Sequence, residues 1–235
     1  MCKIGEVVVV GGVRRSAMIS LSNLSDGRMA HAKSGSWWEN EGQRALANNS
    51  VAYTDKPDME GFMREWLSLV ESKSGERGIF NRKSAQVQAA KNGRREVEHD
   101  FGCNPCSEII LRPYQFCNLS EVVVRASDTQ QTLTDKVRLA TILGTFQSTL
   151  TDFKYLRNVW RKNTEEERLL GVSLTGIMDN DMIAGKSTRL GEHIGATINA
   201  LKYKAIQTNA SLPQQLQMQQ TTAITAVRPR PKQCQ

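Results

Sequence analysis

Short apolar runs alternate along this 235-residue chain with segments of helical periodicity, and this alternation narrows the choice of fold class. Runs of β-branched residues, such as 7–10 and 122–124, are typical of buried strands. Residues 60–72 and 135–151 instead repeat apolar side chains at intervals of three and four, which indicates amphipathic helices. Strands that alternate with helices favour an α/β fold with largely parallel strands.

Further elements follow from the same two patterns. We expect strands over residues 18–21, 109–111, 169–178 and 221–227, and a helix over residues 190–201. Residues 22–58 are polar and match neither pattern, and residues 73–104 predict mostly loop with a short helix. The apolar stripes of the two main helices are Met63, Trp66, Leu67 and Val70 in one and Leu139, Leu143, Phe146 and Leu150 in the other.

Composition and charge limit where such a chain works and what it binds. No run approaches the ~20 apolar residues of a membrane span, and Glu6 interrupts the apolar start, so a signal peptide is not indicated. We therefore expect a cytoplasmic protein with no membrane partner. The net charge of +7 suits phosphorylated small molecules or nucleic acid. Aromatic and basic residues do not interleave, which speaks against direct nucleic-acid binding.

Three of the five cysteines lie close together, in Gly-Cys-Asn-Pro-Cys-Ser-Glu-Ile-Ile-Leu (102–111) and Phe-Cys-Asn-Leu-Ser-Glu (116–121). Cys103 and Cys106 have the spacing of zinc ligands, and Cys117 could be a third. A thioredoxin-like redox pair and buried structural cysteines are two further interpretations. A non-enzymatic zinc-binding or interaction module that uses these three cysteines therefore stays open as an alternative.

The same stretch resembles the active-site finger loop of ribonucleotide reductases, and most of all that of the adenosylcobalamin-dependent class. Other segments resemble the family in the same order: Gly-Gly-Val-Arg-Arg-Ser-Ala (11–17), Gly-Ile-Phe-Asn-Arg (78–82), Arg-Leu-Leu-Gly-Val-Ser-Leu-Thr-Gly-Ile-Met-Asp (168–179) and Thr-Ala-Ile-Thr-Ala-Val (222–227). Several ordered segments are more specific than one cysteine motif. The resemblance implies reduction of ribonucleotides to 2′-deoxyribonucleotides for DNA synthesis.

By position in the motif, the resemblance implies a role for each polar residue of the finger loop. Cys106 corresponds to the residue that becomes a thiyl radical and takes the 3′-hydrogen of the substrate. Glu108 corresponds to the carboxylate that accepts the 3′-hydroxyl proton, and Asn104 to the amide that orients the substrate hydroxyls. On an extended segment these three side chains would point to the same side. We expect Cys106 on a loop that projects toward the centre of the strand layer, within about 4 Å of Cys117 or Glu108.

Other implied parts of the machinery lie outside the first motif. Cys117 corresponds to one member of the redox pair that delivers two electrons. Gly11, Gly12 and Arg14 lie in the segment that resembles the loop between the effector site and the substrate site. The implied cofactor is adenosylcobalamin, although a class that draws its radical from a di-metal subunit is an alternative. The implied partners are a ribonucleoside di- or triphosphate, a deoxynucleotide effector and a thioredoxin-like reductant.

The resemblance also predicts a fold, but only part of one. Residues 1–227 are expected to form an incomplete part of a ten-stranded α/β barrel with a central finger loop at about residues 102–121. Residues 228–235 hold two prolines, depart from the family pattern and are expected to form a disordered tail. Missing strands would leave unpaired edges, so this chain alone is expected to be inactive. Cys103 stands where the family does not usually have cysteine.

Overall fold

The computed structural model describes residues 1–10, 13–14, 16–91, 93, 95–186, 191–215 and 224–229. The chain divides into two compact units, Met1–Pro113 and Tyr114–Gln235. Among these described residues, each unit holds one three-stranded parallel sheet, and the first unit also holds two antiparallel ribbons of two strands each. The predicted α/β class with parallel strands is thereby confirmed, whereas the ten-stranded barrel and the single domain over residues 1–227 stay predictions.

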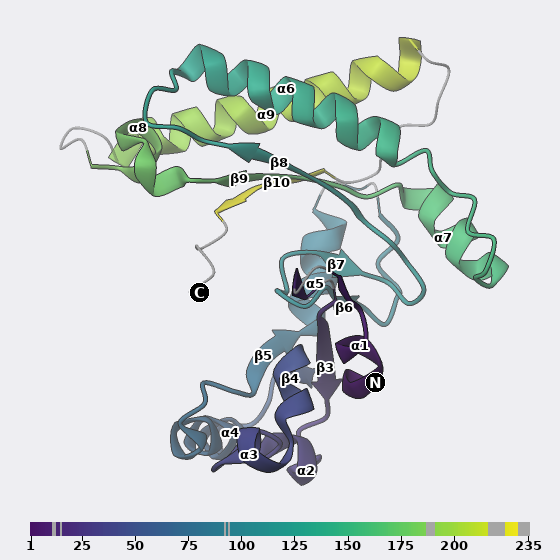
Figure 1. Ribbon diagram of the computed structural model, residues 1–235, viewed down its shortest axis with the longest axis vertical. Coiled ribbons are helices and arrows are strands. Elements are labelled where there is room, and N and C mark those ends of the chain that lie inside the picture. Colours follow the sequence, from purple (N-terminus) through teal and green to yellow (C-terminus); the bar gives the residue numbers. More distant parts are fainter. Residues whose placement is uncertain are drawn as a thin grey trace. The chain divides into compact units, whose positions relative to one another are not determined.

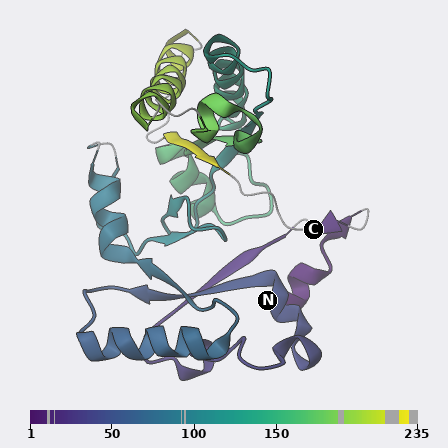
Figure 2. The ribbon, with the colours of Figure 1, turned by 90° about the vertical axis from the view of Figure 1, so that its left-hand side faces the viewer.

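The first unit is built on the sheet β3-β4-β5, with β4 in the middle and all strands parallel. Helix α4 runs along one side of this sheet (Figure 2). The smaller elements are α1 (Cys2–Glu6), β1 (Val9–Val10), β2 (Val13–Arg14), α2 (Gly27–Ala30), α3 (Trp37–Asn40), η1 (Gly42–Leu46), β6 (Gly102–Cys103) and β7 (Ile110–Leu111). The main elements are β3 (Met18–Ser22), β4 (Ala47–Tyr53), α4 (Met59–Ser72), β5 (Gly78–Asn81) and α5 (Arg82–Ala90).

A buried ion pair fastens α4 to the sheet of the first unit. Arg77, which is 2% exposed, precedes β5, and Glu65 lies in the middle of α4. The guanidinium donates to both carboxylate oxygens of Glu65, with Nε–Oε1 at 2.6 Å and Nη2–Oε2 at 2.7 Å. It also donates to the Ser22 hydroxyl, at 2.8 Å, at the end of β3. Breaking such a buried pair by removing one partner costs about 3–5 kcal/mol. The pair therefore holds α4 in place against the sheet.

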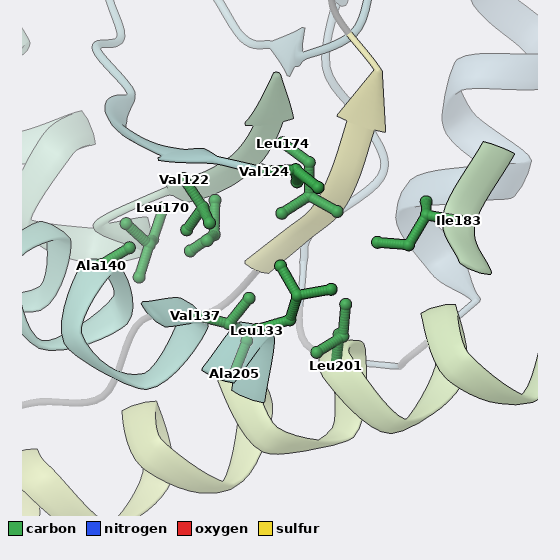
Figure 3. Close-up of a cluster of buried hydrophobic side chains, with 11 residues drawn as sticks. Val122, Val124, Leu133, Val137, Ala140, Leu170, Leu174, Ile183, Leu201 and Ala205 are labelled. Carbon is green, nitrogen blue, oxygen red and sulfur yellow. The ribbon is translucent and has the colours of Figure 1, made fainter. Parts of the chain in front are cut away.

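The second unit is built on the parallel sheet β10-β9-β8, with α6 and α9 side by side over one face (Figure 1). Its elements are β8 (Asn118–Val123), α6 (Gln130–Gln147), α7 (Asn158–Glu167), β9 (Leu170–Thr175), η2 (Ile177–Asp179), α8 (Asp181–Ala184), α9 (Gly191–Gln215) and β10 (Ile224–Pro229). Its core is the cluster in Figure 3: Val122, Val124, Leu133, Val137, Ala140, Leu170, Val172, Leu174, Ile183, Leu201 and Ala205.

Both apolar stripes lie on exposed faces of the structure. The helices occur where the periodicity indicates, but Met63, Trp66, Leu67 and Val70 of α4 are exposed, as are Leu139, Leu143, Phe146 and Leu150 in and just after α6. Instead, α6 buries small residues such as Gly144 and Thr145. A Cβ atom on Gly144 would lie 2.3 Å from Leu170 Cδ1. Small side chains thus let α6 approach β9 closely, and the bulky stripe is left outside.

Strand boundaries show further differences from the sequence patterns. Residues 7–10 do not form a buried strand: Val7 and Val8 are exposed, and β1 covers only Val9–Val10. The central strand β4 lies within residues 22–58, which match no pattern. Strand β10 extends to Pro229, two residues into the predicted tail, and residues 230–235 lie outside the described residues.

Within the described parts of the chain, none of the helices has both the length and the apolar character that crossing a membrane requires.

Candidate active site

The first half of the cysteine motif forms a β-hairpin in the first unit. Strands β6 and β7 pair antiparallel, with Gly102 opposite Leu111 and Cys103 opposite Ile110. Cys103 and Ile110 pack against the core of this unit, beside Phe101, which is completely buried. The base of the hairpin is therefore fixed by apolar contacts, and residues 104–109 form the loop above it.

A tight turn shapes the loop. The Ser107 N–H donates to the Asn104 carbonyl oxygen at 2.9 Å, which closes a four-residue turn with Pro105 and Cys106 at its two central positions. Proline suits the first central position because its ring fixes φ near −65°. Ser107 has φ 65°, a left-handed conformation that redirects the chain toward β7. Because this segment is a turn, the predicted extended geometry with three side chains on one side is wrong.

Asn104 closes the loop with its own side chain. Its Oδ1 accepts the Ile109 N–H at 3.0 Å, and its backbone N–H donates to the Ile109 carbonyl oxygen at 3.3 Å. Asparagine is favoured at such places because its short amide reaches nearby backbone groups. Cys106 lies exposed at the tip, which differs from the predicted projection toward the centre of a strand layer, and Glu108 is half-buried. Asn104 and Cys106 thus lie in the turn, and Glu108 directly follows it in the same short loop.

Cys103 behaves differently from Cys106. Its thiol is half-buried and lies 3.5 Å from the Ser107 hydroxyl. Burial raises the pKa of the Cys103 thiol, the negative charge of Glu108 raises it as well, and the hydrogen bond to Ser107 opposes them. A thiol with a raised pKa is a poor nucleophile near neutral pH. Cys103 is therefore suited to packing the base of the hairpin.

The segment 78–82, which resembles the family pattern before the finger loop, fastens the hairpin to α5. Asn81 caps α5 by accepting the Ser84 N–H at 2.9 Å. Arg82 Nε donates to the Phe101 carbonyl oxygen at 3.1 Å, and it lies 3.0 Å from the Asp100 carboxylate. The first turn of α5 therefore holds the chain directly before β6, which gives these motif residues a positioning role.

Sequence patterns miss one residue that contacts the loop. Asn48, an exposed residue of β4, donates from Nδ2 to the Pro105 carbonyl oxygen at 2.6 Å. Asn48 lies 57 positions before Pro105, in a segment that is polar and carries no periodicity. No sequence signal could have paired these two residues, because the contact depends on how the hairpin packs beside the sheet.

Cys117 belongs to the second unit, where both of its neighbours are held. Phe116 packs against Phe153 and Trp160, with ring centroids 4.9 Å and 4.7 Å away. The Asn118 backbone N–H donates to the Leu169 carbonyl oxygen at 2.9 Å, and its side-chain amide donates to the same oxygen at 3.3 Å. Cys117 thus lies at a fixed place where β8 begins. Its predicted approach to Cys106 stays a prediction.

Gly11 and Gly12 lie outside the described residues, and Arg14 is the second residue of β2. Within the described ranges, no group of three or more His, Cys, Asp or Glu side chains is arranged to hold a metal ion. The zinc module that uses Cys103, Cys106 and Cys117 therefore finds no support in the geometry.

Curated proteins similar to this chain carry one common name, adenosylcobalamin-dependent ribonucleoside-triphosphate reductase. That of Lacticaseibacillus paracasei is 33% identical over 184 residues, which cover 75% of this chain and 23% of that protein. That of Levilactobacillus brevis is 32% identical over 186 residues, with the same shares. That of Lactobacillus leichmannii is 29% identical over 202 residues, which cover 81% of this chain and 25% of that protein.

Two other comparisons give nothing: no protein-family model matches the chain, and no solved structure matches it. The chain spans about a quarter of the length of the curated relatives it matches. Over at least three quarters of its own length, this chain is similar to part of the adenosylcobalamin-dependent ribonucleoside-triphosphate reductases, which confirms the resemblance predicted from its motifs.

Proposed function

We propose that this chain carries the radical-bearing part of a ribonucleotide reductase, with Cys106 as the residue that abstracts hydrogen from the substrate. The observation that carries the proposal is the hairpin loop, which exposes the Cys106 thiol at its tip between Asn104 and Glu108. The relatives' name supplies the reaction and the triphosphate form of the substrate.

The chemistry explains why these residue types are needed. A sugar C–H bond is too inert for side-chain bases, so hydrogen abstraction requires a radical that a cofactor supplies. Adenosylcobalamin, when bound, would supply this one-electron chemistry. Cys106 is exposed at the tip of the loop, so a cofactor bound beside the loop could reach its sulfur. Cys106 is the residue that would meet the cofactor.

Each protein group then has one task. The Cys106 thiyl radical takes the 3′-hydrogen and becomes a thiol, and the Glu108 carboxylate accepts the 3′-hydroxyl proton. Asn104 orients the substrate hydroxyls. The 2′-hydroxyl leaves as water, and a cysteine pair that includes Cys117 supplies two electrons and two protons and becomes a disulfide. The hydrogen then returns from Cys106 to C3′, which regenerates the radical, and Glu108 returns its proton to the 3′-oxygen.

The implied partners follow from this reaction. A thioredoxin-like reductant would reduce the disulfide after each turnover. The segment with Gly11, Gly12 and Arg14 would link a deoxynucleotide effector to the substrate. Because the chain spans about a quarter of its relatives, we expect this polypeptide alone to be inactive, and activity to require the remaining parts of such a reductase.

A chimera tests the proposal. In the Lacticaseibacillus paracasei reductase, the matching segment is replaced by this chain, and deoxynucleotide formation is measured with adenosylcobalamin and a dithiol. We expect activity that Cys106→Ala abolishes. In Cys117→Ser the radical can still form, but the internal reductant is lost, so multiple turnovers should stop. Cys103→Ala is the matched control, since it removes a thiol three positions away, and it should keep activity. An active Cys106→Ala chimera would refute the assignment.

A further inference from the structure

We propose that Asn48 is a positioning residue for Cys106: its side-chain amide holds the tip of the hairpin loop to the central strand of the first unit. The bond joins Asn48 Nδ2 to the Pro105 carbonyl oxygen at 2.6 Å. That carbonyl belongs to the peptide group that links Pro105 to Cys106. The inference rests on the proposed function for its importance to catalysis, whereas the contact itself does not.

The loop has two kinds of restraint, and Asn48 provides the external kind. The bonds from Ser107 to Asn104 and from Ile109 to Asn104 lie within the hairpin, so they maintain its shape but move with it. The bond from Asn48 instead connects the tip to an element far away in sequence. It therefore restricts motion of the whole tip relative to the sheet.

The anchor for this bond is rigid. Asn48 lies in β4, the middle strand of the sheet, and is opposite Ile19 in β3, whereas β5 pairs with β4 from Ser50 onward. A central strand is held by backbone hydrogen bonds along both edges. The neighbouring Asn49 N–H also donates to the Glu76 carboxylate at 3.3 Å. A loop tied to such a strand inherits its rigidity.

Asparagine is suited to this contact, whereas aspartate, which has the same shape, is not. The contact needs a donor, because Pro105 offers only a carbonyl oxygen. Aspartate has the same shape but no donor, and its charge repels the carbonyl oxygen. The position of the sulfur matters, because misplacing a reacting atom by about 1 Å can cost on the order of 10² in rate.

The test compares three variants of the full chain by NMR relaxation and amide exchange. In the wild type, we expect an order parameter of about 0.85 for the Cys106 amide, falling toward about 0.6 in Asn48→Ala and lower in Asn48→Asp. Exchange of the Ser107 and Ile109 amides should accelerate about three- to tenfold. Asn40→Asp, the same chemical change at an exposed residue of α3, is the control and should leave all three amides unchanged.

Two results would overturn the proposal directly. One is an unchanged Cys106 order parameter in Asn48→Asp. The other is an equal acceleration of exchange throughout β3, β4 and β5, which would indicate a general role in folding. In an active chimera, Asn48→Asp should lower kcat several-fold with little change in KM, and an unchanged kcat would also overturn the proposal. The relaxation measurement decides the contact even if the chimera has no activity.

Discussion

Two leucines of helix α6 allow a direct test of which face of this helix is buried. Leu133 and Leu143 lie in the same helix, but Leu133 is 0% exposed in the core cluster and Leu143 is 67% exposed. Helical periodicity alone assigns Leu143, and not Leu133, to the apolar stripe. Replacing each by alanine therefore separates the structure from the sequence pattern, and helix propensity changes by the same amount in both variants.

The expected magnitudes follow from burial. Leu133→Ala removes three buried carbon atoms, worth about 0.8 kcal/mol each, and leaves a cavity, so we expect a total loss of about 3–5 kcal/mol. Leu143 has about a third of its surface in contact, and water fills the space after truncation. Leu143→Ala should therefore cost about 0.8 kcal/mol or less. The two free energies of unfolding should differ by at least about 2 kcal/mol.

Urea unfolding, followed through the amide signals of β8 and β9, measures the stability of the second unit separately. The slope of the free energy against urea should be the same for both variants, since the surface exposed on unfolding hardly changes. If Leu143→Ala destabilises this unit as much as Leu133→Ala does, the assignment of the buried face of α6 is wrong, and the helix is rotated about its axis.

Two further predictions concern ionisation and thiol chemistry. The hydrogen bond from Lys136, with further ones from the backbone and Thr132, holds the pKa of the Asp128 carboxyl below its usual range. A pKa lowered by folding contributes stability above the unfolded value of about 3.9 that is lost as pH falls through the folded pKa. Urea unfolding at a series of pH values should therefore show a smaller loss of stability between about pH 5 and pH 3 in Asp128→Asn than in the wild type, and equal losses would contradict the role of this carboxylate. Iodoacetamide near pH 7 should modify the exposed Cys106 before Cys103, whose thiol is half-buried with a raised pKa. Peptide mass spectrometry over time measures the order, and faster modification of Cys103 would contradict the description of the loop.

The candidate site was accessible from sequence because its motif is local. Asn104, Pro105, Cys106 and Glu108 are close in the chain, so the motif could be matched to the reductase finger loop, and its chemistry predicted from that resemblance, without knowledge of distant contacts. Even so, residues 104–107 form a turn, with Ser107 in a left-handed conformation, and not the extended segment that we expected from the pattern. The spacing of residues specifies that they are neighbours, but hydrogen bonds decide where each side chain points.

Element type and approximate position also followed from sequence, as α4, α6 and β9 illustrate, because period and composition are properties of the chain itself. The buried face did not, since packing depends on what the neighbouring elements offer. Gly144 and Thr145 allow α6 to approach Leu170 and Asn209 more closely than the bulky stripe could, and this close contact decides the orientation of the helix.

Strand β4 and its residue Asn48 show most clearly the difference between what sequence patterns predict and what tertiary contacts decide. The polar residues of β4 give no strand pattern, yet Asn49 and Ser50 are buried. Partners distant in sequence satisfy backbone groups of this buried stretch: Glu76 accepts the Asn49 N–H, and the Ser22 hydroxyl donates to the Ser50 carbonyl oxygen. The sequence by itself predicted the chemistry that is proposed for the loop that bears Cys106. Only the tertiary structure decided what holds that loop, because the bond from Asn48 exists only once the hairpin has packed beside the sheet.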